Sequence, residues 1–443
     1  MTTEISDHHA NPDLGELFRV FGKIGLLSFG GPAGQIALMH RVLVEEKKWL
    51  DEPRFLHALN YCMMLPGPEA MQLATYAGWL MQGVRGGLIA GLLFVLPGAV
   101  VLIALSALYL VLGEVTIVEG LLFGLKAAVL AVVLEALVKV SKRALKNSLM
   151  VTIAIVAFVG IAFLQIPVPV IILSAGLIGA AVHWLMPSDG EEVPAAAPAH
   201  LQHRGEASLG RFVSTTAVWL AIWLGPLLLL FAALGATHVY TLQAGFFSVM
   251  AAVTFGGAYA VLAWVAQQAV EVYGWLRPDE MLTGLGLAET TPGPLILVLL
   301  FVGFLGGARL SGLEPLAGGI GGALVALWFT FVPCFLWIFA GAPYVEKLRD
   351  VKWLSAALTA VTAAVVGVIA NLAFWFGLHV LFARLDEESA GPLRVLVPDP
   401  ASFDPAAGAI ALAAAVALLV LKLNLLVVLG GAALAGMGWV LFV

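Results

Sequence analysis

The chain has 443 residues, of which 61% are apolar and only 11% are charged, and its mean hydropathy is +1.01. Soluble domains carry roughly 25% charged residues, and over half of a folded protein's surface stays wet. A soluble fold of this size therefore has no way to hide so much apolar surface. Because stretches of about 20 mostly apolar residues recur along the chain, the composition indicates an all-α, polytopic integral membrane protein.

Several other classes are excluded at this stage. The net charge of −6 and the lack of a basic stripe argue against a nucleic-acid partner. No GxxxxGK[ST] motif is present, so energy for pumping has to come from a gradient or a separate subunit. Cys62 and Cys334 form no CxxC pair and are expected to be buried core residues. Residues 1–13, with His8 and His9, lack the pattern of a cleavable signal peptide and are expected to be a flexible tail.

Apolar segments follow one another between two polar stretches, 187–211 and 383–406. The first stretch has the composition of a disordered linker, and the second is expected to be a long loop. Glycine and proline interrupt four of the apolar segments, at 14–45, 55–82, 240–268 and 279–308. The continuous segments are 87–111, 115–140, 148–165, 168–186, 212–235, 315–341, 354–382, 406–421 and 424–443.

The interruptions recur at one spacing, which indicates an internal duplication. Each of three motifs returns 226 residues later: Phe29-Gly30-Gly31 as Phe255-Gly256-Gly257, Trp49-Leu50 as Trp275-Leu276, and Pro66-Gly67-Pro68 as Pro292-Gly293-Pro294. Glycine is common in membrane helices, so one FGG alone means little. Three ungapped matches across this stretch indicate two related halves.

These halves predict an inverted-repeat transporter. The first repeat covers 14–186, a cytoplasmic linker 187–211, and the second repeat 240–443. One additional transmembrane helix at 212–235 separates two units of six segments each, and a single extra crossing reverses the second unit relative to the first.

The placement of the 22 lysines and arginines favours re-entrant broken segments. If each broken segment dips into the membrane and returns, 17 of these 22 residues lie on the cytoplasmic side. Those left outside are Arg277, Arg309, Arg384 and Arg394, and Lys126 lies within a span. The N-terminus is then cytoplasmic and the C-terminus periplasmic, as expected in a cell inner membrane.

The breaks themselves are candidate anion sites. Gly30 and Gly31 end one half-helix, and Pro32 suits the first turn of the next. A helix that starts inside the membrane presents free N–H groups and a positive dipole end, which favour an anion. Pro66 and Gly67 offer a second such start, and Gly256, Gly257 and the second PGP offer mirrored ones. The plainer interpretation is that these residues only kink packed helices.

Ionisable residues near the breaks are the next candidates, because a charge within the membrane is costly. Glu69 and Glu289 are candidate proton carriers, although Glu69, in a first turn, is equally well explained as a dipole partner. Lys126 either faces an anion cavity or neutralises a carboxylate such as Glu69. Glu135 is expected to form a surface ion pair with the basic residues that follow it.

Neutral donors and flanking cations complete the candidate site. Gln35, Gln72, Thr290 and Thr291 are able to bind oxyanion oxygens, although hydrogen bonding between packed helices is their usual use. Lys23 and Arg85 flank the breaks and either attract an anion or snorkel to lipid headgroups. The histidines show no ligand spacing, so no metal, no cofactor and no catalytic residue is expected.

The motifs also resemble a known family. Phe21-Gly22-Lys23-Ile24-Gly25, the run from Ser28 to Gln35, and the run from Leu65 to Ala74 are similar to those of the chromate ion transporter family in its long, two-domain bacterial form. The resemblance continues through 254–257 and 288–294. It implies oxyanion transport, typically chromate efflux that confers resistance, driven by protons or by exchange with an anion such as sulfate.

The second half differs from the first at three candidate site positions. The second half has Ala258 at the position equivalent to Pro32, Val261 at that of Gln35 and Thr362 at that of Lys126. We therefore expect an asymmetric anion site.

The sequence thus predicts a secondary active transporter that exports chromate, with a sulfate or other oxyanion carrier as the alternative. Expected partners are the oxyanion, protons or a counter-anion, and the lipid bilayer, with a homodimer as one option. A membrane enzyme would need clustered His or Asp ligands, which the sequence lacks. A passive channel is not excluded by sequence.

Overall fold

The computed structural model describes residues 12–185, 208–255, 258–342, 352–391 and 393–442. His8 and His9, residues 187–207 of the expected linker, and Gly256 and Gly257 lie outside these residues. The described chain is helical apart from one short hairpin, and seven of its helices are long and apolar enough to cross a membrane. This confirms the all-α, polytopic class.

The first half begins with three short helices and continues with longer ones. Its helices are α1 (Leu14–Leu27), α2 (Gly31–His40), α3 (Glu52–Met64), α4 (Glu69–Leu112), α5 (Thr116–Ala144), α6 (Ser148–Ala162) and α7 (Val168–Leu185). The expected segments 55–82 and 87–111 meet in α4, which bends where Gly83 takes a φ of +62°. A glycine adopts this backbone conformation at no steric cost.

The second half follows the additional helix α8 (Leu209–Leu234), which starts slightly earlier than expected. Its helices are α9 (Val239–Val253), α10 (Ala258–Gln267), α11 (Pro278–Thr290), α12 (Val298–Leu310), α13 (Pro315–Gly341), α15 (Lys352–Leu381), α16 (Pro405–Ala415) and α17 (Leu425–Phe442). Helices start directly after the expected breaks, at Gly31, Glu69 and Ala258, and a 3₁₀ turn at Leu295–Leu297 leads into α12.

Local backbone features recur at the spacing of the sequence motifs. A π-helical turn follows α2 at Arg41–Glu46, and another follows α10 at Gln268–Val272. After the first, the Trp49 N–H donates to the Leu43 carbonyl at 2.8 Å; after the second, the Trp275 N–H donates to the Ala269 carbonyl at 2.7 Å. Both pairs of partners are 226 residues apart, so the WL motif marks the same turn in each half.

Small residues allow close helix packing. Gly303 and Gly307 on α12 face Gly322 and Gly318 on α13, where any Cβ would press on the opposite backbone. The two GxxxG pairs thus form one contact, which is the use expected of this spacing in membranes. Gly124 on α5 meets α17 in the same way.

The polar stretch 383–406 differs from the expected loop. Strands β1 (Leu385–Ala390) and β2 (Leu393–Pro398) form an antiparallel hairpin with Leu385 opposite Pro398. The Arg394 N–H donates to the Phe163 carbonyl at 2.9 Å, which ties this hairpin to the end of α6. Two valines in β2 favour a strand, but a pair this short depends on such tertiary support.

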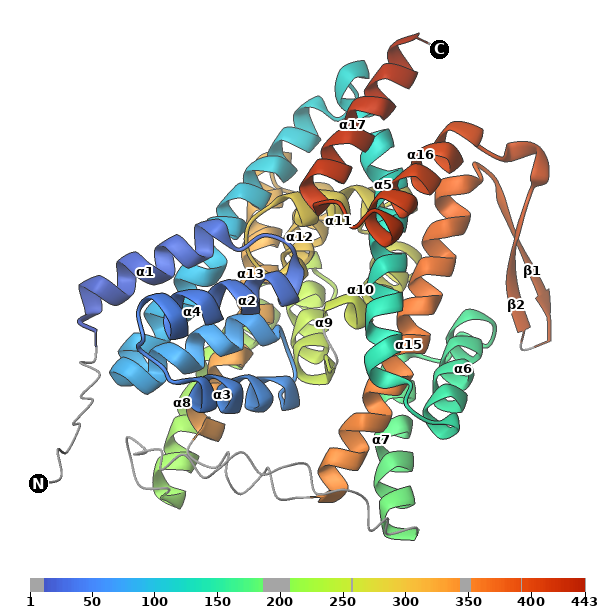
Figure 1. Cartoon of the computed structure of the whole chain (residues 1–443). Helices are drawn as coiled ribbons and strands as arrows, with labels where there is room; N and C mark the ends of the chain where they lie inside the picture. The colour runs from blue at the N-terminus through green and yellow to red at the C-terminus, as the bar shows by residue number, and fades with distance from the viewer. Residues whose placement is uncertain (1–11, 186–207, 256–257, 343–351, 392, 443) are drawn as a thin grey trace, which may run out of the picture.

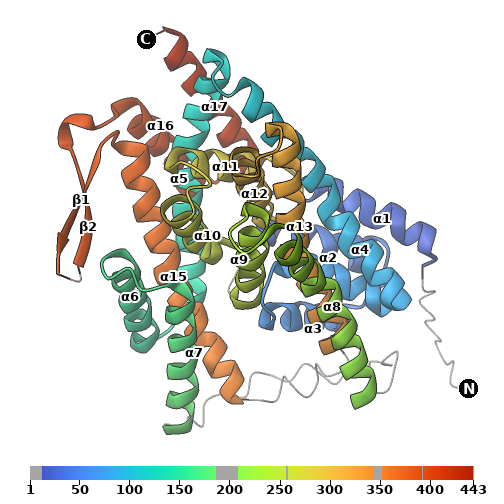
Figure 2. The ribbon, with the colours of Figure 1, turned by 180° about the vertical axis from the view of Figure 1, so that it is seen from behind.

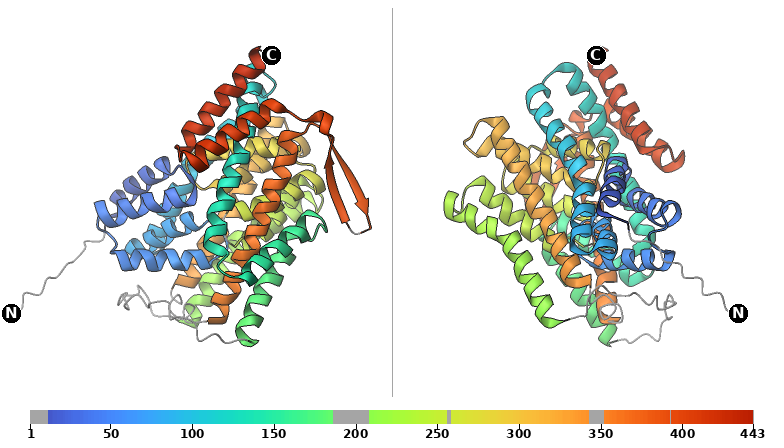
Figure 3. Two further views of the ribbon diagram at one scale, coloured as in Figure 1. Left: turned by 45° about the vertical axis from the view of Figure 1, so that its right-hand side comes forward. Right: turned by 90° about the vertical axis from the view of Figure 1, so that its left-hand side faces the viewer.

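The long helices α5 and α15 pack side by side and run through much of the molecule (Figure 1). The first three helices and the start of α4 lie on one side of this pair, and the β-hairpin lies on the other (Figures 1 and 2). The C-terminus lies at the end of the molecule where α4 meets α5 (Figures 1 and 3). Below, this end is called the α4–α5 end.

Candidate functional site

Each break in one half contacts a break in the other half. The Gly293 N–H donates to the Ser28 carbonyl at 2.8 Å, and the Gly67 N–H donates to the Thr254 carbonyl at 2.8 Å. Residue 28 corresponds to 254 and residue 67 to 293 at the 226-residue spacing. The two bonds are therefore equivalent contacts between an FGG break and a PGP break. We call them the Ser28–Gly293 crossing and the Gly67–Thr254 crossing.

Gln35 fixes the Ser28–Gly293 crossing. Its side chain is 1% exposed, and Nε2 donates to the Gly293 carbonyl at 2.6 Å and to that of Ser28 at 3.4 Å. Gln35 Oε1 has no hydrogen-bond partner in the described part of the chain. Val261, its counterpart in the second half, has no side-chain donor, so the two crossings are held differently.

The start of α2 is open to its surroundings. Gly30 and Gly31 have φ values of +86° and +70°, and the helix start has no side-chain cap. Gly30, Ala33 and Gly34 are exposed, whereas every residue from 291 to 300, at the second PGP, is buried. Uncapped N–H groups at an accessible helix start are a suitable place for an anion.

At the Gly67–Thr254 crossing, Gln72 is fully buried and its Nε2 donates to the Pro66 carbonyl at 2.7 Å. Gly67 has a φ of +117°, and a Cβ there would lie 2.9 Å from Gln72 Nε2 and 3.2 Å from Cys334 Sγ. Cys334 is buried with a free thiol, as is Cys62. Only glycine satisfies both the backbone conformation and the space at this position.

Glu69 lies in the first turn of α4, two residues beyond Gly67. Its side chain is partly buried, and no hydrogen bond or ion pair reaches its carboxylate from the residues that the structure describes. Because an ionisable side chain near a buried helix start is costly in a membrane, Glu69 remains a candidate functional residue.

Glu289 joins the two crossings through a partner that the sequence analysis did not identify. It is 4% exposed and accepts a 2.5 Å hydrogen bond from the Tyr259 hydroxyl. Tyr259 lies five residues past Thr254, and Glu289 lies four residues before Gly293. The bond therefore links both crossings. The available signal was a tyrosine two residues after the second FGG, at a position where the first half has Ala33.

The hydroxyls of Thr290 and Thr291 are already used within α11. They donate to the carbonyls of Leu287 and Ala288 at 2.8 and 2.9 Å. Binding an oxyanion through either threonine requires its hydroxyl to leave this bond.

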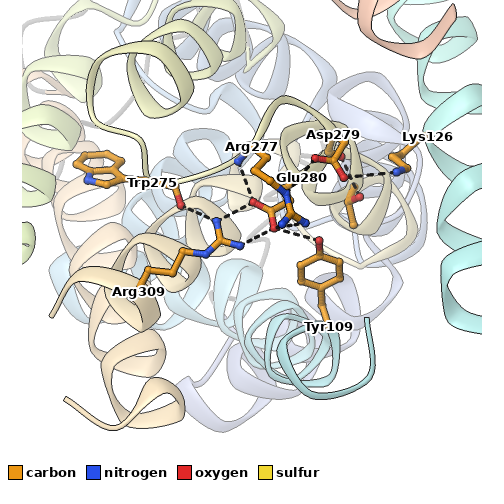
Figure 4. Close-up of polar contacts among 8 residues, drawn as sticks. Tyr109, Lys126, Trp275, Arg277, Asp279, Glu280 and Arg309 are labelled. Carbon is orange, nitrogen blue, oxygen red and sulfur yellow. Dashed lines mark hydrogen bonds and ion pairs between the residues drawn. The ribbon is translucent and has the colours of Figure 1, made fainter. Parts of the chain in front are cut away.

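Lys126 lies apart from the breaks. Its ammonium forms an ion pair with Asp279 Oδ2 at 3.7 Å, at the start of α11, whereas the PGP break follows the end of α11 (Figure 4). The partner of Lys126 is thus Asp279 and not Glu69. Glu135, on the same helix as Lys126, pairs with Lys139 at 2.6 Å, in agreement with the sequence-based expectation.

Asp279 belongs to a polar cluster that sequence reasoning did not assemble. We call it the outer cluster: Tyr109, Lys126, Arg277, Asp279, Glu280 and Arg309. Glu280 is 1% exposed and accepts two hydrogen bonds from Arg309, at 2.6 and 2.7 Å, and one from the Tyr109 hydroxyl at 3.3 Å (Figure 4). The sequence analysis treated Arg277 and Arg309 only as charges on one side of the membrane, and it placed Lys126 within a span without this partner.

Lys23 and Arg85 are exposed, and no ion pair involving them occurs in the described ranges. A cavity of about 370 Å³ lies elsewhere, between α10, α15 and the β-hairpin, and is lined by Glu271, Asn371 and Arg394 among others. It contains none of the break residues, so it does not define the candidate site.

Comparisons with known proteins agree with the sequence resemblance. A family model described as "Chromate transporter" matches residues 15–180 and 242–437. The chain is 32% identical to the chromate transport protein of Pseudomonas aeruginosa over 80% of this chain and 79% of that protein. It is 29% identical to the probable chromate transport protein of Synechococcus elongatus, over 82% and 85% of the two chains. For the chromate transport protein of Cupriavidus metallidurans, identity is 28% over 83% and 84%. No solved structure matches the chain.

Proposed function

The chain belongs to the chromate transporter family, and from this premise we propose that it exports chromate across the bacterial inner membrane by alternating access. The observation that carries the proposal is the reciprocal pair of hydrogen bonds between the FGG and PGP breaks. Broken helices of two related halves that meet within the membrane are the usual setting for a transporter's substrate site.

The substrate site in this proposal is the accessible start of α2. Gly30 and Gly31 present N–H groups there, and Gln35 holds the second PGP break beside them. Pro66, Gly67 and Gln72 form the corresponding support at the other crossing. Uncapped N–H groups bind a tetrahedral dianion by charge and hydrogen bonding.

Two carboxylates couple protons to this movement in our proposal. Glu289, with its Tyr259 hydrogen bond between the crossings, is the principal candidate, and Glu69 is the second. Both belong to elements that meet at the breaks, so a change in their charge acts directly on the packing of the two halves.

The proposed topology is an inverted repeat with a cytoplasmic N-terminus and a periplasmic C-terminus. Exposed basic residues cluster at the C-terminal end of α5, where Lys139, Lys142 and Arg143 lie, and fewer lie at the α4–α5 end. The positive-inside rule then makes the α4–α5 end periplasmic. Lys23 and Arg85 would attract the anion from the cytoplasm.

The decisive experiment measures chromate uptake into inverted membrane vesicles that are energised by a proton gradient. We expect accumulation above the external concentration, its loss on adding an uncoupler, and a large decrease in Glu289→Gln. Glu387→Gln removes an exposed carboxylate of the β-hairpin and serves as the matched control. Equilibration without accumulation would indicate a passive channel and overturn the proposal.

Sulfate is the main alternative substrate, because N–H donors separate two tetrahedral dianions of similar charge poorly. Excess sulfate tests this in the same vesicles. Chromate uptake that sulfate does not reduce would exclude a shared site, whereas strong competition with faster sulfate flux would make chromate a passenger.

A further inference from the structure

We propose that the outer cluster is a second oxyanion site. In the structure the Asp279 carboxylate contacts Lys126 and Arg277, and a bound oxyanion replaces this carboxylate at the same two cations. The inference rests on the proposed function, since it assumes an oxyanion substrate. It adds a site at the opposite end of α11 from the breaks, and it assigns Asp279 the role of a competing carboxylate.

The cluster has a fixed part and a loosely held part. Glu280, 1% exposed, makes the paired hydrogen bonds to Arg309, whose guanidinium also donates to the Trp275 carbonyl at 3.2 Å. The Arg277 N–H donates to Glu280 at 2.8 Å. These bonds fix the start of α11 and the end of α12. Two-point binding of an arginine to a buried carboxylate is rigid.

Asp279 is held much less tightly. It is 3.7 Å from Lys126 Nζ and 3.4 Å from Arg277 Nε, and 47% of its side chain is exposed. Arg277 is 66% exposed, while Lys126 is 26% exposed. Both distances are longer than those of the Glu280 contacts, and an exposed pair such as that of Arg277 with Asp279 exchanges partners at little cost. An incoming anion can therefore reach both cations.

The charges favour such an exchange. Lys126, Arg277 and Arg309 face Asp279 and Glu280, so the outer cluster has one more positive than negative charge (Figure 4). A dianion in the place of Asp279 brings twice the charge of a carboxylate to the same two cations, and Coulomb attraction scales with that charge. Its four oxygens can accept from both cations at once.

The outer cluster and the breaks lie at opposite ends of α11. Asp279 and Glu289 are ten residues apart on α11, which is about 15 Å along a helix. The cluster lies toward the α4–α5 end, because its member Tyr109 is close to the end of α4. One helix therefore carries the Tyr259–Glu289 pair at one end and the outer cluster at the other. In our proposal an exported anion moves from the breaks toward the start of α11, where the outer cluster lies.

Calorimetric titration of the purified full chain with sulfate tests the proposal without transport. Asp279→Asn, which removes the competing carboxylate, should bind sulfate at least about fivefold more tightly than the wild type. Lys126→Gln should bind it more weakly, and Asp279→Asn combined with Lys126→Gln should show no gain over Lys126→Gln alone. Glu387→Gln changes the net charge equally, far from the outer cluster, and should leave the affinity unchanged. Asp279→Ser replaces Asp279→Asn should the latter fold poorly.

The opposite pattern would overturn the inference. If Asp279 and Lys126 form only a structural pair, both single variants lower the melting temperature, the double variant restores it, and none tightens sulfate binding. An unchanged sulfate affinity in Asp279→Asn would also overturn the inference. Failure of the proposed function appears separately, as a wild-type protein that binds sulfate but does not accumulate chromate in vesicles.

Discussion

The hydrogen bonds between Glu280 and Arg309 allow a quantitative prediction about stability. Glu280→Gln preserves the shape of the side chain but removes its charge, and it turns an amide N–H₂ toward a guanidinium that has only donors. Glu280 is 1% exposed, and its carboxylate receives both Arg309 bonds together with contacts from Arg277 and Tyr109. The variant keeps only one acceptor oxygen for these partners, and it removes the negative charge that they share.

Removing one partner of a buried ion pair costs about 3–5 kcal/mol. Because Arg309 is 35% exposed and regains some hydration, we expect the lower end, about 3 kcal/mol of unfolding free energy. Glu387→Gln is the matched control. It breaks a carboxylate–arginine pair in which Glu387 and Arg394 are 53% and 55% exposed, and exposed pairs contribute about 0–1 kcal/mol.

The measurement is equilibrium unfolding of the purified protein in mixed detergent micelles with increasing SDS, for the wild type and both variants. The prediction is a large loss for Glu280→Gln and almost none for Glu387→Gln. Equal losses within about 1 kcal/mol would refute the reasoning. That result would mean that water hydrates Glu280 as well as it hydrates an exposed carboxylate.

Two further predictions concern the breaks. A Cβ at Gly98 would overlap the Pro292 carbonyl oxygen, so Gly98→Ala should lower the unfolding free energy by about 1–3 kcal/mol and reduce chromate transport. The control is Gly225→Ala in α8, where a Cβ meets nothing within 4 Å, and it should change neither quantity. Equal behaviour of the two variants would argue against close contact between α4 and the second PGP break. Tyr259→Phe removes the 2.5 Å hydrogen bond to Glu289. It should decrease the uncoupler-sensitive accumulation of chromate in vesicles, while chromate binding measured by calorimetry persists. Chromate accumulation at the wild-type level would show that the hydroxyl is dispensable.

Local sequence determined the class of the protein and the position of its breaks. Apolar composition requires lipid, and glycine and proline end and start helices through their own backbone restrictions. For this reason Gly30 precedes α2 and Gly31 is its first residue, and Pro66 and Gly67 precede the start of α4. The duplicated spacing likewise predicted where equivalent turns recur.

Expectations that depended on longer-range contacts fared less well. The stretch 383–406 was expected to be a loop and contains the β-hairpin, which is held by a hydrogen bond from Arg394 to Phe163. The sequence gives two partners for Lys126, an anion cavity or Glu69, while the ion pair is made with Asp279. In both cases the partner lies more than 150 residues away in the chain.

Sequence by itself thus determined a membrane protein of two related halves with four broken segments, because composition, glycine and proline act locally. Only the tertiary structure decided which break meets which, that Tyr259 pairs with Glu289, and that Lys126 belongs to the outer cluster. Such contacts depend on how helices pack, and a side chain's type and spacing do not specify which distant residue will complete its hydrogen bonds or balance its charge.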